Sequence, residues 1–411
     1  MRKNALFGIF LTVFLDMLGF GMFIPDLQIR GKQLAAQVLG VNPLSDSVQL
    51  GMLVGFSLAI FSLAQLIISP IMGRLSDARG RKIVLLWSAI FTLIGYLIYA
   101  NATSFSLIMV SRLMTGIGAA NLGVAFAYVA DVTTPENRGK GLGMIGAAFG
   151  LGFVLGPPLG VLLLHLGKDS PALLGYVGAA LILVNVLFIQ FGLAESPREN
   201  LGKDAPSLWQ NFRLAWTYPQ LRLLLIMSFV LSLGFTNLET TYFQLLESPR
   251  SNYQLTAEQA KVAGGWVLTF VGVVAAIMQG GLVGPAIKRF GEINLVKWGF
   301  LITAIGLLLV PHGTLWAPTL IVVALIGIGN GLANPSLSAL TSHNAPITMQ
   351  GGIFGISMAL GALARTVGPI VSNPLFQKNP AYPYLLGGGL ILIPAFAAWG
   401  LRPVPPAESA T

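Results

Sequence analysis

The stretch Gly73-Arg74-Leu75-Ser76-Asp77-Ala78-Arg79-Gly80-Arg81-Lys82 is a short charged loop between two long apolar segments. A weaker echo, Gly284-Pro285-Ala286-Ile287-Lys288-Arg289-Phe290-Gly291, begins 284 − 73 = 211 residues later. A charged loop between two segments that are each long enough to cross a bilayer indicates a membrane protein. Its recurrence further along the chain indicates a duplicated unit.

The composition of the 411-residue chain supports this interpretation. Hydrophobic residues make up 55% and charged residues 9%, whereas soluble domains carry about 25% charged residues. Apolar segments of about 20 residues, enough to cross a hydrocarbon core, recur along the chain, and the alternating pattern of a barrel is absent. We therefore expect an all-α membrane protein with twelve transmembrane helices. The expected spans are 4–26, 48–72, 82–101, 104–131, 138–165, 171–194, 220–246, 260–287, 293–312, 315–341, 349–375 and 381–401.

The net charge of +9 is explained by membrane topology, so no nucleic-acid partner is expected. Of the 24 Lys and Arg residues, sixteen lie in the two termini or in the loops on the same side of the membrane as the termini. Six lie in the loops on the other side of the membrane. The remaining two, Arg112 and Arg365, lie within expected helices. Because cytoplasmic loops carry the excess of positive residues, we expect both termini in the cytoplasm. The expected location is the cell inner (plasma) membrane.

Two further landmarks repeat at nearly the same offset. Gly116-Ile117-Gly118 recurs as Gly327-Ile328-Gly329 (329 − 118 = 211), and Gly156-Pro157 recurs as Gly368-Pro369 (368 − 156 = 212). A parallel repeat of six helices predicts two bundles of like orientation. The expected units are an N-terminal bundle over 1–194, a connector over 195–219 and a C-terminal bundle over 220–411.

The connector contains Trp209, Phe212 and Trp216 at three- and four-residue spacing. This spacing predicts a short amphipathic helix on the inner leaflet; the alternative is a plain linker with incidental aromatic residues. The stretch from Asp26 to Gln49 is expected to be an external loop without chemistry.

Several motifs resemble one transporter family. The loop 73–82 resembles motif A of the major facilitator superfamily, and other motifs resemble its twelve-helix drug:proton antiporters, which include tetracycline exporters. The resemblance implies the major facilitator fold, a central cavity lined by the first, fourth, seventh and tenth helices, and drug efflux. Those exporters carry acids in the third and ninth helices, where this chain has none, so metal–tetracycline is not expected as cargo. The further motifs are Leu15–Gly21 with Pro25, Arg112–Gly116, Gly152–Gly160 and Ala194–Pro197.

Four ionisable residues fall within expected helices: Asp16, Arg112, Glu239 and Arg365. Each costs about 2.5–3.5 kcal/mol to insert at the bilayer centre by insertion scales. Asp16 and Glu239 are proton-carrier candidates, because a carboxyl that alternates between apolar and cationic surroundings takes up and releases a proton. Asp16 is alternatively a structural hydrogen-bond acceptor, and Glu239 part of a hydrated polar patch. Arg112 resembles an arginine linked to proton coupling, and Arg365 is expected to form a structural pair.

The charged loop is expected to act as a latch. Asp77 suits the positive end of a helix, so we expect it to contact the start of the eleventh helix near Gln350. Arg81 is expected to pair with Asp131, while Gly73 permits close approach. This latch would favour the outward-open state; the alternative is that the charges only set topology.

Two further groups of residues are candidates for the transport machinery. Gly156 and Pro157 in the fifth helix are expected to form a tight hinge against the opposite bundle. Polar and aromatic residues of the helices are candidates for the substrate cavity. They are Phe20, Gln65, Asn121, Phe126, Tyr242, Gln244, Asn330 and Asn334.

The sequence therefore predicts a proton-coupled secondary transporter that exports small amphipathic or cationic organic compounds by alternating access. Its partners would be a small-molecule substrate, protons and the lipid bilayer, and it is expected to be a monomer. No cysteine, nucleotide-binding motif or catalytic triad is found, so we expect no enzyme activity, cofactor or metal. The alternatives are a symporter or facilitator that imports a sugar, organic acid or peptide, and a non-transporting membrane receptor or membrane enzyme.

Overall fold

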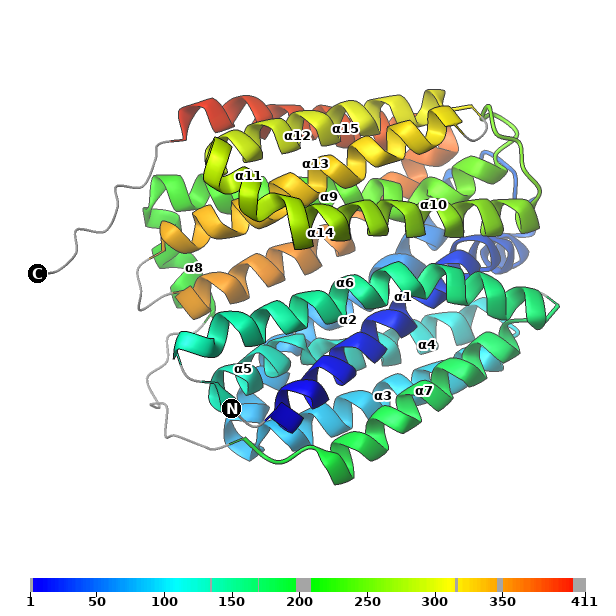
Figure 1. Ribbon diagram of the computed structural model, residues 1–411. Helices are drawn as coiled ribbons and strands as arrows, with labels where there is room; N and C mark the ends of the chain where they lie inside the picture. The colour runs from blue at the N-terminus through cyan, green and yellow to red at the C-terminus, as the bar shows by residue number, and fades with distance from the viewer. Residues whose placement is uncertain are drawn as a thin grey trace, which may run out of the picture.

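The computed structural model describes residues 3–133, 135–168, 170–196, 208–314, 317–345 and 350–401. Within these ranges, twelve helical spans are long and apolar enough to cross a membrane. They lie side by side with their axes roughly along one direction (Figure 1). The predicted all-helical membrane fold is confirmed.

The helices of each sequence half gather into one bundle (Figure 1). The first half contains α1 (Lys3–Leu39), α2 (Val48–Arg79), α3 (Arg81–Ala100), α4 (Phe105–Gly118), α5 (Leu122–Val132), α6 (Pro135–Leu166) and α7 (Pro171–Gly192). The second contains α9 (Pro219–Glu247), α10 (Ala257–Ile277), α11 (Val283–Phe290), α12 (Glu292–Leu309), α13 (Ala317–His343), α14 (Gln350–Lys378) and α15 (Tyr382–Ala397).

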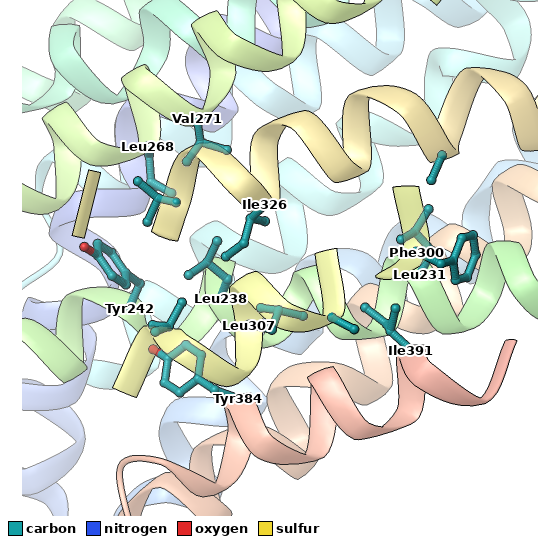
Figure 2. Close-up of a cluster of buried hydrophobic side chains, with 14 of the residues drawn as sticks. Leu231, Leu238, Tyr242, Leu268, Val271, Phe300, Leu307, Ile326, Tyr384 and Ile391 are labelled. Carbon is teal, nitrogen blue, oxygen red and sulfur yellow. The ribbon is translucent and has the colours of Figure 1, made fainter. Parts of the chain in front are cut away.

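Each bundle has its own apolar core. The first core is built from residues between Leu6 and Leu193, all from the first half of the chain. The second core joins α9, α10, α12, α13 and α15, whose side chains meet in Figure 2. Ile24 and Ile29 of α1 also belong to the second core. Helix α1 therefore packs against both bundles.

Two spans are interrupted helices. A 3₁₀ turn at Ala119–Asn121 separates α4 from α5, and a π-helical segment at Met278–Leu282 separates α10 from α11. The π segment directly precedes the echo of the charged loop. Because π-helical segments locally change the direction of a helix, the echo stands on a differently shaped helix end from the loop at Gly73.

The stretch from Asp26 to Leu39 is helical, so the expectation of an external loop there is wrong. Helix α1 runs uninterrupted through Pro25 to Leu39. Charged residues of this stretch have partners on the other bundle: Lys32 Nζ lies 3.2 Å from Glu247 Oε2 of α9. Pairing across the bundles allows these charges to remain within a helix.

The connector contains a helix, α8 (Leu208–Thr217), at the position where the aromatic spacing predicts one. The rings of Phe212 and Trp216 stack with centroids 5.2 Å apart. Ala215 is buried in a small core with Leu221, Leu225, Ala345, Ile353 and Ile356. The α8 helix thus packs against the second bundle, while residues 197–207 of the connector lie outside the described residues.

The glycines of α6 pack against α1 of the same bundle. A Cβ on Gly156 would lie 2.7 Å from the Cα of Gly21, and one on Gly160 would lie 2.0 Å from the carbonyl oxygen of Met22. The expectation that Gly156-Pro157 forms its tight contact with the opposite bundle is therefore wrong for Gly156. The opposite bundle meets α6 elsewhere, where Gly265 and Gly272 of α10 approach valine side chains.

We expect Gly160→Ala to destabilise the fold by about 1–3 kcal/mol, the usual cost of overpacking. The added methyl group has no room beside Met22. Gly150→Ala on the same helix is the matched control, because its Cβ would meet open space. Thermal unfolding in detergent measures both, and equal midpoints for the two variants would contradict this packing.

Candidate functional site

A small central cavity lies between the two bundles. Helices α1, α2 and α4 line it from the first bundle, and α9 and α14 line it from the second. Its volume of about 40 Å³ is well below the roughly 300–1,000 Å³ of typical ligand pockets, so the cavity is narrow in this conformation. The lining residues are Phe20, Ile24, Leu27, Gln28, Leu58, Ser62, Arg112, Thr236, Glu239, Thr240, Arg365 and Pro369.

Three of the residues singled out in the sequence, Phe20, Arg112 and Glu239, line this cavity. Arg365, expected only as a structural pair, lines it as well. Sequence reasoning missed Thr236 and Thr240, although with Glu239 they have the i, i+3, i+4 spacing of one helix face.

The tenth expected helix, α13, contributes no residue to the described lining. Its place is taken by α2 and α14, which approach each other closely. Asn330, Asn334, Tyr242, Gln244 and Phe126 are not among the residues that line this cavity, and their assignment to the substrate cavity stays a prediction. Tyr242 and Gln244 are fully buried further along α9, and Phe126 packs against the first core.

Arg112 is the most isolated charge of the site. Its side chain is 7% exposed, its Nε has no hydrogen-bond partner, and its guanidinium lies 4.4 Å from the centre of the Phe61 ring. Arg365 has one long hydrogen bond, from Nη2 to Gln65 Oε1 at 3.4 Å. Neither arginine forms an ion pair with a described carboxylate.

Asp16 lies on α1 one turn before Phe20 and is held by one amide. Asn121 Nδ2 donates to Asp16 Oδ2 at 2.7 Å, while Asp16 Oδ1 is buried without a partner among the described residues. Gln65 donates to the carbonyl of Ala119 at 2.9 Å. Asn121 and Gln65, both proposed from sequence for the cavity, thus support Asp16 and Arg365 instead of joining the lining.

Ion pairs join the two bundles on one side of the cavity, at the ends of α1 and α9. The fully buried Asp26 accepts a hydrogen bond from Tyr99 Oη at 2.7 Å, and its Oδ1 lies 3.7 Å from Lys261 Nζ of α10. Arg250 lies 3.0 Å from Asp46, and Lys32 pairs with Glu247. We call this the opposite side, because α1 begins and α15 ends at the other end of the molecule, the terminal side (Figure 1).

The glycines of α2, like the ion pairs, bring the two bundles together on the opposite side of the cavity. A Cβ on Gly55 would lie 2.3 Å from the carbonyl oxygen of Pro369, and one on Gly51 would lie 2.6 Å from that of Asn373. Towards the terminal side, Gly73 of α2 and Gly146 of α6 face open space. Within the described ranges, the polar contacts between bundles all lie at the cavity or on the opposite side.

The sequence profile of the Major Facilitator Superfamily matches residues 9–369, with a second match over 260–411. The chain belongs to this superfamily. Its relatives include the tetracycline resistance protein, class C, of Escherichia coli, 28% identical over 95% of each chain. Another is the quinolone resistance protein NorA of Staphylococcus aureus (strain MSSA476), 26% identical over 95% of this chain and 94% of its own.

The fold agrees with that of solved superfamily transporters. The human organic anion transporter MFSD10 has a TM-score of 0.71 and 25% identity, over 96% of this chain and 99% of its own. The predicted resemblance to efflux proteins of the superfamily is confirmed. In the described part of the chain, no group of three or more His, Cys, Asp or Glu side chains could hold a metal ion.

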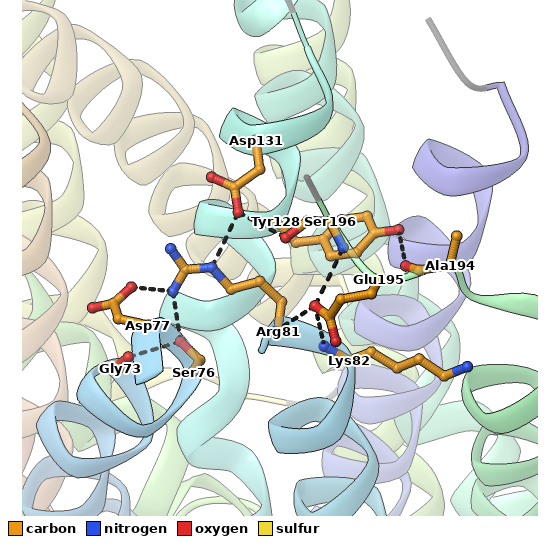
Figure 3. A network of polar contacts seen from close by, with 10 residues as sticks. All are labelled: Gly73, Ser76, Asp77, Arg81, Lys82, Tyr128, Asp131, Ala194, Glu195 and Ser196. Atoms are coloured by element: carbon orange, nitrogen blue, oxygen red, sulfur yellow. Dashed lines mark hydrogen bonds and ion pairs between the residues drawn. The ribbon is translucent and has the colours of Figure 1, made fainter. Parts of the chain in front are cut away.

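The expectation of a loop over residues 73–82 is wrong, because this motif A segment forms the last turns of α2, Gly80 and the start of α3. The segment connects several helices of the first bundle (Figure 3). Arg81 Nε donates to Asp131 Oδ2 at 3.1 Å, and Arg81 also bonds Ser76 and Asp77. Glu195 Oε1 accepts from the backbone N–H of Arg81 at 2.7 Å and thereby caps the start of α3. The segment thus ties α2, α3, α5 and the end of α7 together.

Among the described residues, the partner of Asp77 is Arg81, and the Asp77 side chain is 66% exposed. The segment before α14 and the side chain of Gln350, where the latch contact is expected, lie outside the described part of the structure. The latch therefore stays a prediction.

We expect Arg81→Gln to destabilise the first bundle by about 1.5–3 kcal/mol, because it removes charge-assisted hydrogen bonds of a largely buried guanidinium. Arg79→Gln is the control, since Arg79 is exposed on the same segment. Thermal unfolding in detergent distinguishes them. If the Arg79 variant were as unstable as the Arg81 variant, the network would not be responsible.

Proposed function

We propose that this superfamily member is a proton-coupled exporter of small organic compounds that works by alternating access. It would act as a monomer in the cell inner membrane, with both termini in the cytoplasm. The observation that carries this proposal is a cavity with ionisable residues from both bundles, closed on the opposite side by the ion pairs that join the bundles in the described ranges. A site between two like-oriented bundles is the arrangement that alternating access uses.

In this proposal the structure represents the inward-open state. The ion pairs of Asp26, Lys32 and Arg250 hold the opposite side closed. If these ion pairs break while the motif A segment contacts α14, the cavity would open to the opposite side of the molecule. The efflux functions in the names of the relatives support export, and the direction of flux in inverted vesicles distinguishes it from import.

Asp16 and Glu239 are the proposed proton carriers. Each is a carboxyl within a membrane span without a cationic ion-pair partner among the described residues. A carboxyl in such surroundings gains or loses a proton as its contact with water or with the arginines changes. Arg112 and Arg365 are near enough to the same cavity to influence Glu239.

We expect Asp16→Asn and Glu239→Gln each to slow substrate-dependent dissipation of a pH gradient in proteoliposomes, because neither amide carries a proton. The double variant should fall to the rate of empty proteoliposomes. Glu258→Gln is the control, as Glu258 is exposed at the start of α10. Wild-type rates in both single variants would refute the assignment.

Asp26→Asn should open the opposite side, because it removes the charge that attracts Lys261. The chain has no cysteine, so Ser62→Cys places a single thiol in the cavity lining. We expect labelling by a charged methanethiosulfonate reagent from the opposite side to increase with Asp26→Asn. Lys261→Gln should act alike and Glu258→Gln should not; unchanged labelling in both pair variants would count against the gate.

A further inference from the structure

We propose that the cargo is a small amphipathic organic anion whose acidic group binds between Arg112 and Arg365. The inference rests on the proposed transport function and specifies its substrate class. It departs from the cationic cargo that the resemblance to drug antiporters allows. The observation behind it is a pair of cavity-lining arginines, one from each bundle, that form no close ion pair with a described carboxylate.

The cavity wall carries an excess of positive charge. Its ionisable residues are Arg112, Arg365 and Glu239, two cations and one carboxyl. By contrast, the buried charges of Asp26 and Lys32 are paired. An unpaired guanidinium away from water is costly, so the site is suited to a ligand that supplies the missing negative charge.

The surroundings of Arg112 leave its Nε without a hydrogen-bond partner among the described residues. The Phe61 ring covers one face of the guanidinium at 4.4 Å, a cation–π arrangement that restricts its motion. A planar guanidinium binds a carboxylate through two parallel hydrogen bonds, so the guanidinium edge that carries Nε is complementary to a carboxylate or sulfonate.

The rest of the lining is suited to an apolar body. Phe20, Ile24, Leu27, Leu58 and Pro369 contribute the apolar part of the wall. The cargo would therefore place its ring system against α1 and α2 and its acidic group towards α4 and α14.

Glu239 competes with the cargo for the same arginines. It lines the cavity together with Arg112 and Arg365, and its own backbone carbonyl accepts a hydrogen bond from Gln28 of α1. An ionised Glu239 repels an incoming anion, whereas a neutral side chain leaves both arginines to the ligand. Substitution of Glu239 should thus have the opposite effect from substitution of either arginine.

The test uses three probes that share one ring system: 2-naphthoate, 2-naphthylmethanol and 2-naphthylmethylammonium. Their dissociation constants for the purified full chain in detergent are measured by calorimetry. We expect naphthoate to bind most tightly, and Arg112→Gln and Arg365→Gln each to weaken it at least about tenfold, the loss of one charged hydrogen-bonding partner. The same variants should change the dissociation constant of the neutral alcohol by no more than about twofold, since the alcohol places no charge beside the arginines.

Glu239→Gln should tighten the binding of naphthoate and weaken the binding of the ammonium probe. Arg112→Lys should bind naphthoate with intermediate affinity, because it keeps the charge but loses the planar fork. Arg289→Gln is the control for removal of an arginine, as Arg289 is exposed on α11. If Arg112→Gln does not fold, Arg365→Gln and Glu239→Gln carry the test.

Tighter binding of the ammonium than of naphthoate would overturn the inference, as would equal loss of all three probes in the arginine variants. In either case proton-coupled transport of the ammonium probe in proteoliposomes would leave the proposed function intact. If no probe is bound and none dissipates a pH gradient, both proposals fail.

Discussion

The cost of an ionisable side chain within a bilayer governs the arrangement of this protein. An insertion cost of about 2.5–3.5 kcal/mol for each such residue has to be offset by a partner or by contact with water. Asp26 and Lys32 are offset by partners on the other bundle. Arg112, Arg365 and Glu239 have no ion-pair partner in the described ranges and surround the central cavity instead. The distinction between paired and unpaired charges separates the gate from the binding site.

The duplicated scaffold carries its polar chemistry unequally. In the first half, Arg81 joins Ser76, Asp77 and Asp131 into a network that connects several helices. In the second half, Lys288 stands where Asp77 does and is exposed. A duplicated chain thus keeps the helix arrangement, while the polar network of residues 73–82 is not repeated at 284–291 among the described residues.

Local sequence patterns predicted the helical elements well, because hydrophobic length and aromatic spacing act over one helix. The connector helix α8 lies where Phe212 and Trp216 indicate it. The extent of α1 was missed, since the charges after Asp26 resemble a loop until their partners on α9 and α10 are known. Gly156 was assigned to the wrong neighbour for the same reason: a close-packing glycine does not specify the helix it meets.

The sequence by itself determined the membrane class, the duplication, the superfamily resemblance and the four ionisable residues within the helices. These depend on composition, hydrophobic length and motifs, which are properties of short segments. Only the tertiary structure decided that Arg365 faces the cavity, that α2 and α14 replace α13 in its wall, and that Asp26 joins the bundles. Each of these depends on contacts between residues far apart in the chain, because the packing of two bundles determines which helix faces meet.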